Sequence, residues 1–341
     1  MISGGGRPRR EPSLADVAKA AGVSAQTVSR VATGSDRVRP TTKERVVAAM
    51  QELGYRPNGA ARALKYGRYR SIGVIMFTLA SYGNVRTLSA VADEADRGGY
   101  SLSFISLRAA TEASLSGAFH RLAEQAVDGV IILIESHVAR DAAIRIPPGM
   151  PVVVIDSSAD GAHPFVDTDQ AQGARQATEH LLDLGHETVF HIAGPEGSYS
   201  AQRRLAAWQA VLEERGLRVP VPFVGDWSAD SGRAAGEWLA RMPDATAVFA
   251  ANDQMALGLM HALHERGRRL PDEMSIVGFD DTPESGNFWP PLTSVHQNFA
   301  EVGVQALRAL ITLIERGEVA DPVIVPTTLV VRGSTTTPPA L

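Results

Sequence analysis

The sequence predicts two structural parts, a small all-α domain followed by an α/β region made of two doubly wound parallel-sheet subdomains. In residues 13–64, short amphipathic segments are separated by Gly and Ser turn signals, which is typical of a compact helical domain. From residue 71 onward, short apolar runs alternate with longer segments of helical periodicity. This alternation predicts parallel strands joined by crossover helices.

Charge is distributed unevenly along the chain. The protein has 341 residues, 44% of them hydrophobic, and a formal net charge of -5. Residues 1–70 hold 14 Lys and Arg against 5 Asp and Glu, whereas the rest of the chain holds 19 against 33. Because attraction to phosphate depends on local charge, a basic start on an acidic chain favours nucleic-acid binding by the first domain alone.

The sequence lacks the features that are typical of several other classes of protein. With no cysteine, the chain has no disulfide or thiolate chemistry. The first residues contain no apolar signal segment, and no run of about 18 apolar residues is present to span a bilayer. Common hydrolase, phosphate-loop and zinc-protease motifs are absent, and the nine His show no metal-ligand spacing. We expect a cytoplasmic protein that is not an enzyme and binds no metal, cofactor or membrane.

Two helices joined by a tight turn are predicted at the start of the first domain. Ser13 is a suitable N-cap, Asp16 favours the helix dipole, and Gly22 ends the helix. Ser24 then caps a second helix over 25–32. Because the turn between them is so short, the two helices must cross steeply, as in a helix-turn-helix.

A third helix and a short helical tail complete this domain. Thr41 and Glu44 have the spacing of a capping box, and an apolar stripe follows before Gly54, formed by Val46, Val47, Met50 and Leu53. In the tail PNGAARAL (57–64), Asn58 can cap a helix of one to two turns, which is too short to be stable alone.

The segment LADVAKAAGVSAQTVSRV (14–31) resembles the head signature of the lactose-repressor (LacI/GalR) family of transcriptional regulators. The resemblance implies that Ala25, Gln26 and Arg30 occupy base-reading positions, where Gln pairs with adenine and Arg with guanine. Ala25 replaces the Tyr of the lactose repressor, so that protein's operator does not carry over. The resemblance also implies contacts to the DNA backbone, which fix register, from Ser13, Ser24, Thr27, Ser29, Arg37, Arg39 and Thr42.

The same resemblance assigns a role to the tail. In the family, two hinge helices pair across a dimer on operator DNA and push a leucine into the minor groove. Leu64 stands at the leucine position, Ala61 permits close contact between the helices, and Asn58 and Lys65 flank them. The alternative for Leu64 is simple packing on the next domain.

The body is predicted to contain two successive series of strands and helices. The first series has strands over 71–77, 100–106, 129–134 and 151–155 and helices over 88–97 and 115–125. The second has helices over 170–184, 201–215, 232–240 and 253–265 and strands over 188–192, 222–225, 247–250 and 275–279. The last segments, 292–296, 299–316 and 323–331, are expected to be shared between the two subdomains.

Three segments of the body, GDWSADSG, ANDQMALGLM and GFDDTPESGNFWPPLTSVHQNF, also resemble the family. The resemblance implies a body of periplasmic-binding-protein type. We expect a head over 1–56, a hinge helix and linker over 57–70, and an effector-binding and dimerisation body over 71–335. Within the body, the N-subdomain is expected to comprise 71–168 plus 299–320, and the C-subdomain 169–298 plus 321–335.

Ligands of open parallel sheets bind beyond the carboxyl ends of the strands, so polar residues that follow strands are candidates for a site. By resemblance, Arg204, Asn252 and Asp280 occupy polyol-binding positions. Beside them stand Asp156, Ser200 and Gln297, with Trp227 and Phe299 placed to stack on a sugar ring. The loop after the first body strand supplies Ser81, Tyr82 and Asn84. Asp253 and Asp281 are interpreted as helix caps, and a salt bridge for Arg204 or core packing for Trp227 are alternatives.

These features predict a dimeric, nucleoid-associated repressor of carbohydrate-utilisation genes, released from a palindromic operator by a mono- or disaccharide. A purine-responsive, corepressor-type regulator is the alternative, because an arginine and aromatic rings also suit a flat base. A solute-binding protein without a DNA role is a more remote one. The polar, Pro-rich end VVRGSTTTPPAL lacks the leucine heptads of a tetramer, which favours a homodimer that binds double-stranded DNA and a small-molecule effector.

Overall fold

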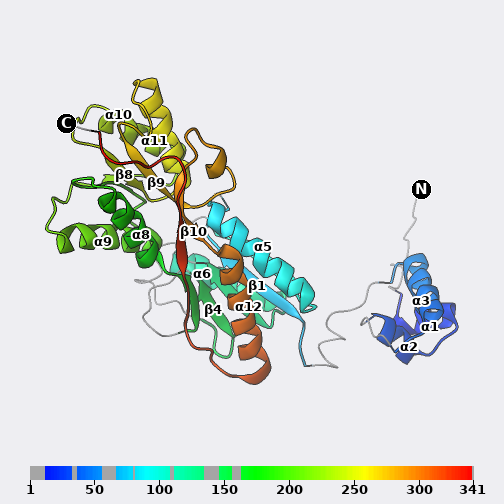
Figure 1. Ribbon diagram of the computed structural model, residues 1–341. Helices are drawn as coiled ribbons and strands as arrows, with labels where there is room; N and C mark the ends of the chain where they lie inside the picture. The colour runs from blue at the N-terminus through cyan, green and yellow to red at the C-terminus, as the bar shows by residue number, and fades with distance from the viewer. Residues whose placement is uncertain are drawn as a thin grey trace, which may run out of the picture. The chain divides into compact units, whose positions relative to one another are not determined.

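Figure 1 shows the computed structural model, which describes residues 12–32, 37–55, 67–79, 81–107, 111–133, 146–155 and 163–339. The chain separates into two compact units, Met1–Tyr69 and Arg70–Leu341, here called the head and the body. Some predicted site residues lie outside the described residues, namely Asp156 in the body and Asn58, Ala61, Leu64 and Lys65 in the hinge.

The described part of the head contains α1 (Leu14–Ala21), α2 (Ala25–Ala32) and α3 (Pro40–Leu53). The caps predicted for the first two helices are confirmed. Ser13 and Asp16 form a reciprocal capping box, and the Thr27 amide donates to Ser24 Oγ at 3.1 Å. Gly22 ends α1 in the left-handed region, with a φ of 62°, which a residue without a Cβ adopts at little cost.

The start of α3 differs from the prediction. Pro40 begins the helix and Arg39 is the N-cap residue, with no side-chain hydrogen bond to the helix amides. The capping box predicted at Thr41 is therefore wrong. Proline suits this first position because its fixed φ is already helical and its missing amide hydrogen would have no partner inside the helix.

The inward face of α3 also differs in part from the prediction. Val46 is buried as expected, but Ala49 is the next buried residue, while Val47 and Leu53 are each 38% exposed. The core of the head, which the three helices share, consists of Val17, Ala18, Ala21, Val28, Val31, Val46 and Ala49.

The first sheet of the body has the strand order β11-β5-β4-β3-β1-β2, with every neighbouring pair parallel. Its strands are β1 (Ser71–Met76), β2 (Ser101–Ser106), β3 (Gly129–Leu133), β4 (Val152–Ile155), β5 (Phe165–Thr168) and β11 (Val323–Val325). Helices α5 (Tyr82–Arg97) and α12 (Phe299–Arg316) pack together over one face, and α6 (Glu112–Glu124) covers the other. Because both faces are covered, β1, β3 and β4 are buried throughout.

The second sheet has the order β12-β10-β9-β8-β6-β7, and only β12 is antiparallel to its neighbour. Its strands are β6 (Phe190–Ala193), β7 (Phe223–Val224), β8 (Ala247–Ala250), β9 (Ser275–Asp280), β10 (Thr293–Gln297) and β12 (Thr327–Val330). Helices α8 (Gln170–Asp183) and α9 (Tyr199–Glu214) cover one face, and α10 (Ala229–Leu239) and α11 (Asp253–Glu265) the other, with a 3-10 turn, η1 (Ser285–Asn287), before β10. These two subdomains and the helical head confirm the predicted fold class.

The chain crosses between the subdomains after β5, after β10 and after β11. The first and third crossings are joined, because the Asp169 amide donates to the Val325 carbonyl at 2.8 Å. Since Val323–Val325 pairs with β5, its expected place in the C-subdomain is wrong, and only the chain after it joins the second sheet. Strand β5 itself was not predicted.

Four helices of the body begin earlier than the sequence suggested. Helix α5 begins at Tyr82 instead of residue 88, α6 at Glu112 instead of residue 115, α9 at Tyr199 instead of residue 201, and α10 at Ala229 instead of residue 232. Helices α5 and α10 each contain a glycine near the start, Gly83 and Gly232. A Cβ on Gly83 would lie 2.6 Å from Phe299 Cε1, and one on Gly232 would lie 2.0 Å from the Met255 carbonyl oxygen. Both glycines allow close packing inside a helix.

Candidate functional site

A cavity of about 120 Å³ lies where the carboxyl ends of strands from the two subdomains face each other. Leu133 and Ile155 come from the ends of strands in the first sheet, and Asp280 and Gln297 from the ends of strands in the second. Every effector candidate that the structure describes lines this cavity, namely Ser81, Tyr82, Asn84, Ser200, Arg204, Trp227, Asn252, Asp280, Gln297 and Phe299.

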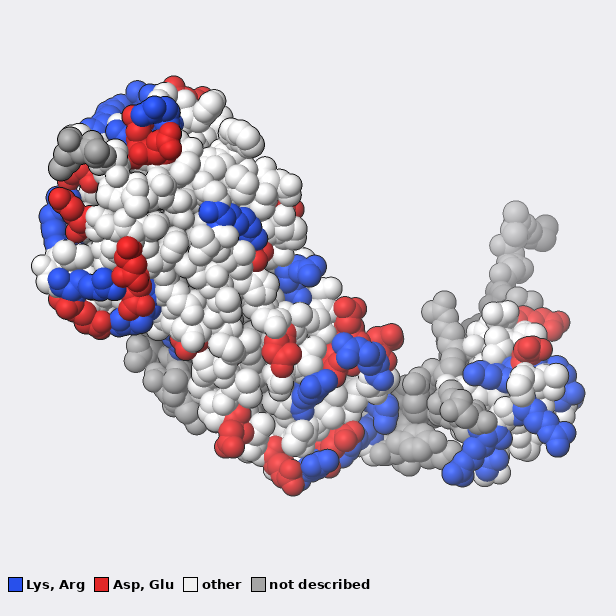
Figure 2. Space-filling model, viewed as in Figure 1, with Lys and Arg blue, Asp and Glu red and all other residues white. Residues whose placement is uncertain are grey.

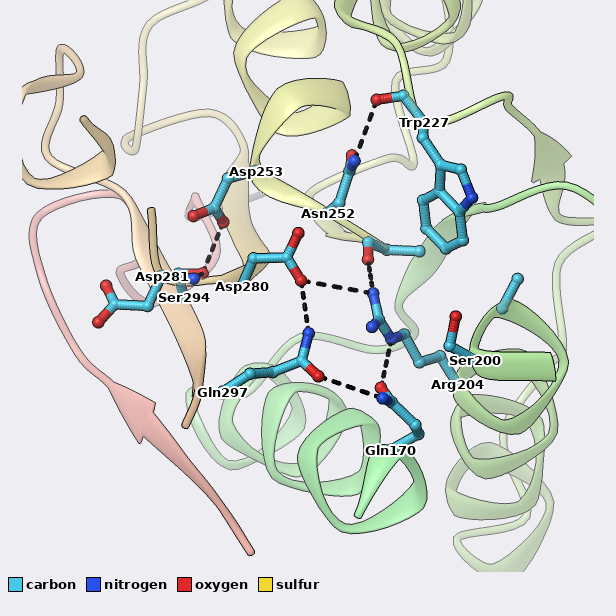
Figure 3. A network of polar contacts seen from close by, with 12 residues as sticks. Gln170, Ser200, Arg204, Trp227, Asn252, Asp253, Asp280, Asp281, Ser294 and Gln297 are labelled. Carbon is cyan, nitrogen blue, oxygen red and sulfur yellow. Dashed lines mark hydrogen bonds and ion pairs between the residues drawn. The ribbon is translucent and has the colours of Figure 1, made fainter. Parts of the chain in front are cut away.

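Arg204, in α9, is the centre of the polar side of the cavity (Figure 3). It is only 4% exposed. Its Nε donates to Gln170 Oε1 at 2.8 Å, and its Nη1 donates to the Ala251 carbonyl and lies 3.8 Å from Asp280 Oδ1. Arg204 therefore combines the two predicted roles, because its guanidinium lines the cavity and also faces the carboxylate of Asp280.

Two glutamines close a ring of four side chains with Arg204 and Asp280. Gln297 Nε2 donates to Asp280 Oδ1 at 2.6 Å, and Gln170 Nε2 donates to Gln297 Oε1 at 3.1 Å. Gln170 directly follows the first crossing between subdomains, and Gln297 directly precedes the second. The ring therefore links the cavity to the segments about which the subdomains are hinged.

Asp280 is held in an unusual position at the end of β9. Its φ is 102°, outside the region that residues with a Cβ prefer. Burial raises the pKa of its carboxyl group to about 6, against the opposing effects of the Arg204 charge and the hydrogen bond from Gln297. A carboxyl group of this kind accepts hydrogen bonds when ionised and donates one when protonated.

Asn252, which lines the cavity, is also the residue that caps α11, in place of its neighbour Asp253. Asn252 is the N-cap of α11, with Oδ1 accepting from the Met255 amide at 2.8 Å, and its Nδ2 donates to the Trp227 carbonyl at 3.0 Å. The side-chain amide of Asn252 therefore stabilises local structure at the edge of the cavity. The interpretation of Asp253 as the helix cap is wrong.

Asp253 is instead fully buried and joins three segments beneath the site. Its carboxylate accepts from the Thr282 amide at 2.8 Å and from Ser294 Oγ at 2.6 Å. Burial and the nearby charge of Asp280 raise its pKa to about 7. Asp281 is not a helix cap either, because its carboxylate accepts from Arg332 Nη2 at 2.6 Å.

Aromatic rings form further walls of the cavity. The Trp227 indole lies directly over Gly194, where a Cβ would come 2.3 Å from the ring. On the other subdomain, the rings of Tyr82 and Phe299 meet edge to face, with centroids 5.8 Å apart. Tyr82 and Asn84 belong to the first turn of α5 and not, as predicted, to a loop.

Six polar residues that line the cavity were not predicted from the sequence, namely Thr87, Asp167, Thr168, Gln170, Ser198 and Gln254. Asp167, Thr168 and Gln170 form a group. All three stand at or just after β5. This strand is short and contains an aspartate, so it lacks the continuous apolar run that identified its neighbours. Within the described residues, no cluster of His, Cys, Asp or Glu has the arrangement of a metal site.

Most of the candidate DNA-contacting residues of the head lie at or near the starts of helices. Ala25 and Gln26 are exposed in the first turn of α2, and Arg30 is exposed one turn further along. Ser13 and Ser24 are N-caps, Arg39 is the N-cap residue of α3 and Thr42 stands in its first turn. The remaining candidates, Thr27, Ser29 and Arg37, are half-buried or exposed nearby.

A head of this kind, with a body whose two subdomains enclose a small polar cavity, defines the class of ligand-responsive DNA-binding regulators. Residues 13–58 match the family described as bacterial regulatory proteins, lacI family, and residues 178–335 match a periplasmic binding protein-like domain. The chain is 36% identical over 331 residues to the lactose operon repressor of Escherichia coli (strain K12), covering 96% of this chain and 91% of that one. The chain therefore belongs to the lacI family and is a DNA-binding transcriptional regulator.

Other relatives and solved structures are similar over most of the chain. The regulator CelR of Thermobifida fusca is 35% identical, with 96% of this chain and 99% of that one covered, and the repressor PurR of Haemophilus influenzae is 32% identical, with 89% and 91% covered. A lac repressor dimer bound to operator and the anti-inducer ONPF matches with a TM-score of 0.82, at 35% identity and 96% and 100% coverage. A CelR–cellobiose complex matches with a TM-score of 0.71, at 32% identity and 95% and 99% coverage.

Proposed function

We propose that the protein represses carbohydrate-utilisation genes and is released from a palindromic operator when a mono- or disaccharide binds in the cavity. The observation that carries this proposal is the ring of Arg204, Gln170, Gln297 and Asp280 opposite aromatic walls. A planar guanidinium, amides and a carboxylate suit paired hydroxyl groups, and the Trp227 indole suits the apolar face of a sugar ring. The likeness to the lactose operon repressor and to the CelR–cellobiose complex supports the same class of effector.

Release from DNA requires that the sugar bind one arrangement of the two subdomains more tightly than another. Two features of the cavity support this coupling: its lining comes from both subdomains, and the polar ring includes residues beside two crossings. A corepressor would act through the same cavity with the opposite preference. Since every relative described above is named as a regulator, we assign no catalytic role to the cavity.

For the head, we propose that Gln26 and Arg30 read base edges in the major groove, with Ala25 limited to an apolar contact. Figure 2 shows Lys and Arg side chains on the surface of the head, which suits attraction to phosphate. The hinge residues Asn58, Ala61, Leu64 and Lys65 keep their proposed place in the minor groove, and a nucleoid-associated, cytoplasmic location follows from this function.

We also propose a homodimer, because a palindromic operator requires two heads. Exposed apolar side chains include Phe104 on the edge strand β2, Leu257 on α11 and Trp289 after η1, which is 91% exposed. The likeness to a lac repressor dimer supports this assembly.

Calorimetry on the full-length protein with cellobiose, lactose, glucose, galactose, hypoxanthine and guanine tests the effector class. Binding of a sugar, together with release from promoter DNA of the neighbouring genes in a gel shift, is the expected result. Micromolar binding of a purine with no sugar bound would make the sugar assignment wrong and favour the PurR-like alternative, which the 32% identity to that repressor supports. DNA binding that does not weaken with added salt would contradict the proposed phosphate contacts.

A further inference from the structure

Two consecutive arginines of α9 face aspartates from different subdomains. Arg204 faces Asp280, at the end of β9 in the second sheet. Its neighbour Arg203 donates from Nη1 to Asp167 Oδ2, and Asp167 belongs to β5 in the first sheet. One helix of the second subdomain is therefore joined by an ion pair to the first, directly beside the residue at the centre of the cavity.

A second contact holds α9 to the first subdomain. Tyr199, four residues before Arg203 and so on the same face of the helix, packs into the apolar cluster that contains Ile75, Leu115 and Phe165. Tyr199 is buried. The start of α9 therefore moves relative to the first subdomain only if both the ring and the ion pair shift with it.

The ion pair is costly to separate because Asp167 is buried. Its side chain is 2% exposed, while that of Arg203 is 30% exposed. Burial raises the pKa of the Asp167 carboxyl group, and the Arg203 charge and hydrogen bond, together with the Thr168 amide at 2.7 Å, act against that rise. A buried carboxylate that loses its cation is strongly destabilising, so the pair favours the subdomain arrangement in which it is closed.

We infer that the Asp167–Arg203 ion pair is a tie between the subdomains that sets the balance between the operator-binding and effector-binding arrangements. This inference rests on the proposed function, because the tie acts on the same cavity. Asp167 lines the cavity, so an effector hydroxyl that reaches its carboxylate competes with Arg203. An effector that draws Arg204 and Asp280 together also shifts α9, and Arg203 moves with its neighbour.

The test uses full-length Asp167→Asn, Arg203→Gln and the double variant, with Arg218→Gln as control. Arg218 pairs with Asp244 on the exposed surface of the second subdomain, away from the other sheet. Operator affinity without sugar and sugar affinity without operator are measured for each protein, using the sugar that the calorimetric panel identifies. By linkage, a shifted balance moves the two affinities in opposite directions, and we expect about fivefold or more for each single variant.

Because both single variants remove the same tie, the double variant should behave like either one and not like their sum. Unchanged affinities, or sugar binding and operator binding that both weaken, would overturn the inference, since local damage to the cavity does not strengthen either ligand. If no compound binds the wild-type protein, the proposed sugar response is wrong. The inference about the ion pair is then tested by measurements on the protein without effector. Operator affinity must then still change, and amide hydrogen exchange in β5 and at the start of α9 must become about tenfold faster than in the control.

Discussion

The guanidinium carbon of Arg204 lies 3.8 Å from the centre of the Phe279 ring. Phe279 directly precedes Asp280 in β9, so a single strand offers the arginine an aromatic face and then a carboxylate. On the Trp227 side, the same carbon lies 5.5 Å from the ring centre. The guanidinium is thus oriented before any ligand arrives, which reduces the entropy that an effector must overcome.

Replacement of Arg204 by lysine should distinguish the contribution of the positive charge to sugar binding from that of the planar guanidinium group. Lysine keeps the positive charge but cannot bind Gln170, the Ala251 carbonyl and a ligand with one planar group. We expect sugar affinity, measured by calorimetry, to fall about tenfold or more, with operator affinity within about threefold of wild type. Arg215→Lys, in an exposed pair with Asp183 of the same subdomain, is the control and should change neither affinity. Normal sugar binding by Arg204→Lys would contradict the role given to the guanidinium fork.

The strands of the body were largely predictable because most of them are buried on both faces and so form continuous apolar runs, as in Gly129–Leu133 and Val152–Ile155. Strand β5 was not predicted because Asp167 and Thr168 interrupt its apolar sequence. Because this strand was not predicted, part of the candidate site was not predicted either. With β5 unrecognised, the cavity residues Asp167 and Gln170 had no strand end to mark them.

The role of a glycine depends on tertiary contacts as well as on the local sequence. Gly22 and Gly54 end helices with positive φ, as the sequence suggested. Gly83 and Gly232 stand inside helices, where they allow Phe299 and the Met255 backbone to pack closely against them. No local sequence pattern reveals such contacts. The helix cap was assigned to Asp253 instead of Asn252 for a similar reason, since only the neighbouring segments show that the Asp253 side chain turns inward.

The contact between Gly194 and Trp227 leads to a prediction about the aromatic wall of the cavity. A Cβ at residue 194 would lie 2.3 Å from the indole, so Gly194→Ala must displace the ring. We expect sugar affinity to fall several-fold, because the ring no longer covers the ligand, while operator affinity without sugar stays close to wild type. Trp227 fluorescence should also shift in the variant. An unshifted spectrum would show that the indole does not occupy the position described.

The buried Asp253 should make stability depend on pH. Its folded pKa of about 7 is above the ordinary value of about 3.9, so the folded protein holds this proton at pH values where the unfolded chain has released it. This group therefore lowers the free energy of unfolding progressively from about pH 4 to pH 7, by an amount on the order of a few kcal/mol. Asp280, with a pKa of about 6, acts in the same direction.

Urea unfolding of wild type and Asp253→Asn at several pH values isolates this effect. The amide does not titrate, so the stability difference, wild type minus variant, should decrease as the pH rises from 4 to 7. Asp244→Asn, at an exposed ion pair, provides the control for changes elsewhere in the chain. A difference that stays constant across this range would show that the pKa of Asp253 is not raised in the folded protein.

The packing of α10 on α11 predicts an unequal response of two glycines to the same substitution. A Cβ on Gly258 would lie 1.8 Å from the Ala229 carbonyl oxygen, whereas one on Gly117, in α6, meets nothing within 4 Å. We expect Gly258→Ala to destabilise the body by about 3 kcal/mol or more, because two helix backbones must separate. Gly117→Ala should be neutral or stabilise by up to about 1 kcal/mol, since alanine favours the helix. Thermal unfolding of both proteins distinguishes them, and equal midpoints would contradict the packing.

In the head, Gln26 and Arg39 should affect DNA binding in different ways. If Gln26 pairs with adenine, Gln26→Ala should relax the preference at one base pair of each operator half-site by about 1–3 kcal/mol, with the salt dependence unchanged. Arg39→Ala should weaken binding to all sequences alike and reduce the salt slope by about 1, because one phosphate contact is lost. Affinities for operators carrying each base at each position, measured at several salt concentrations, separate these outcomes. A uniform loss of affinity in Gln26→Ala would instead place this side chain, exposed in the first turn of α2, on the DNA backbone.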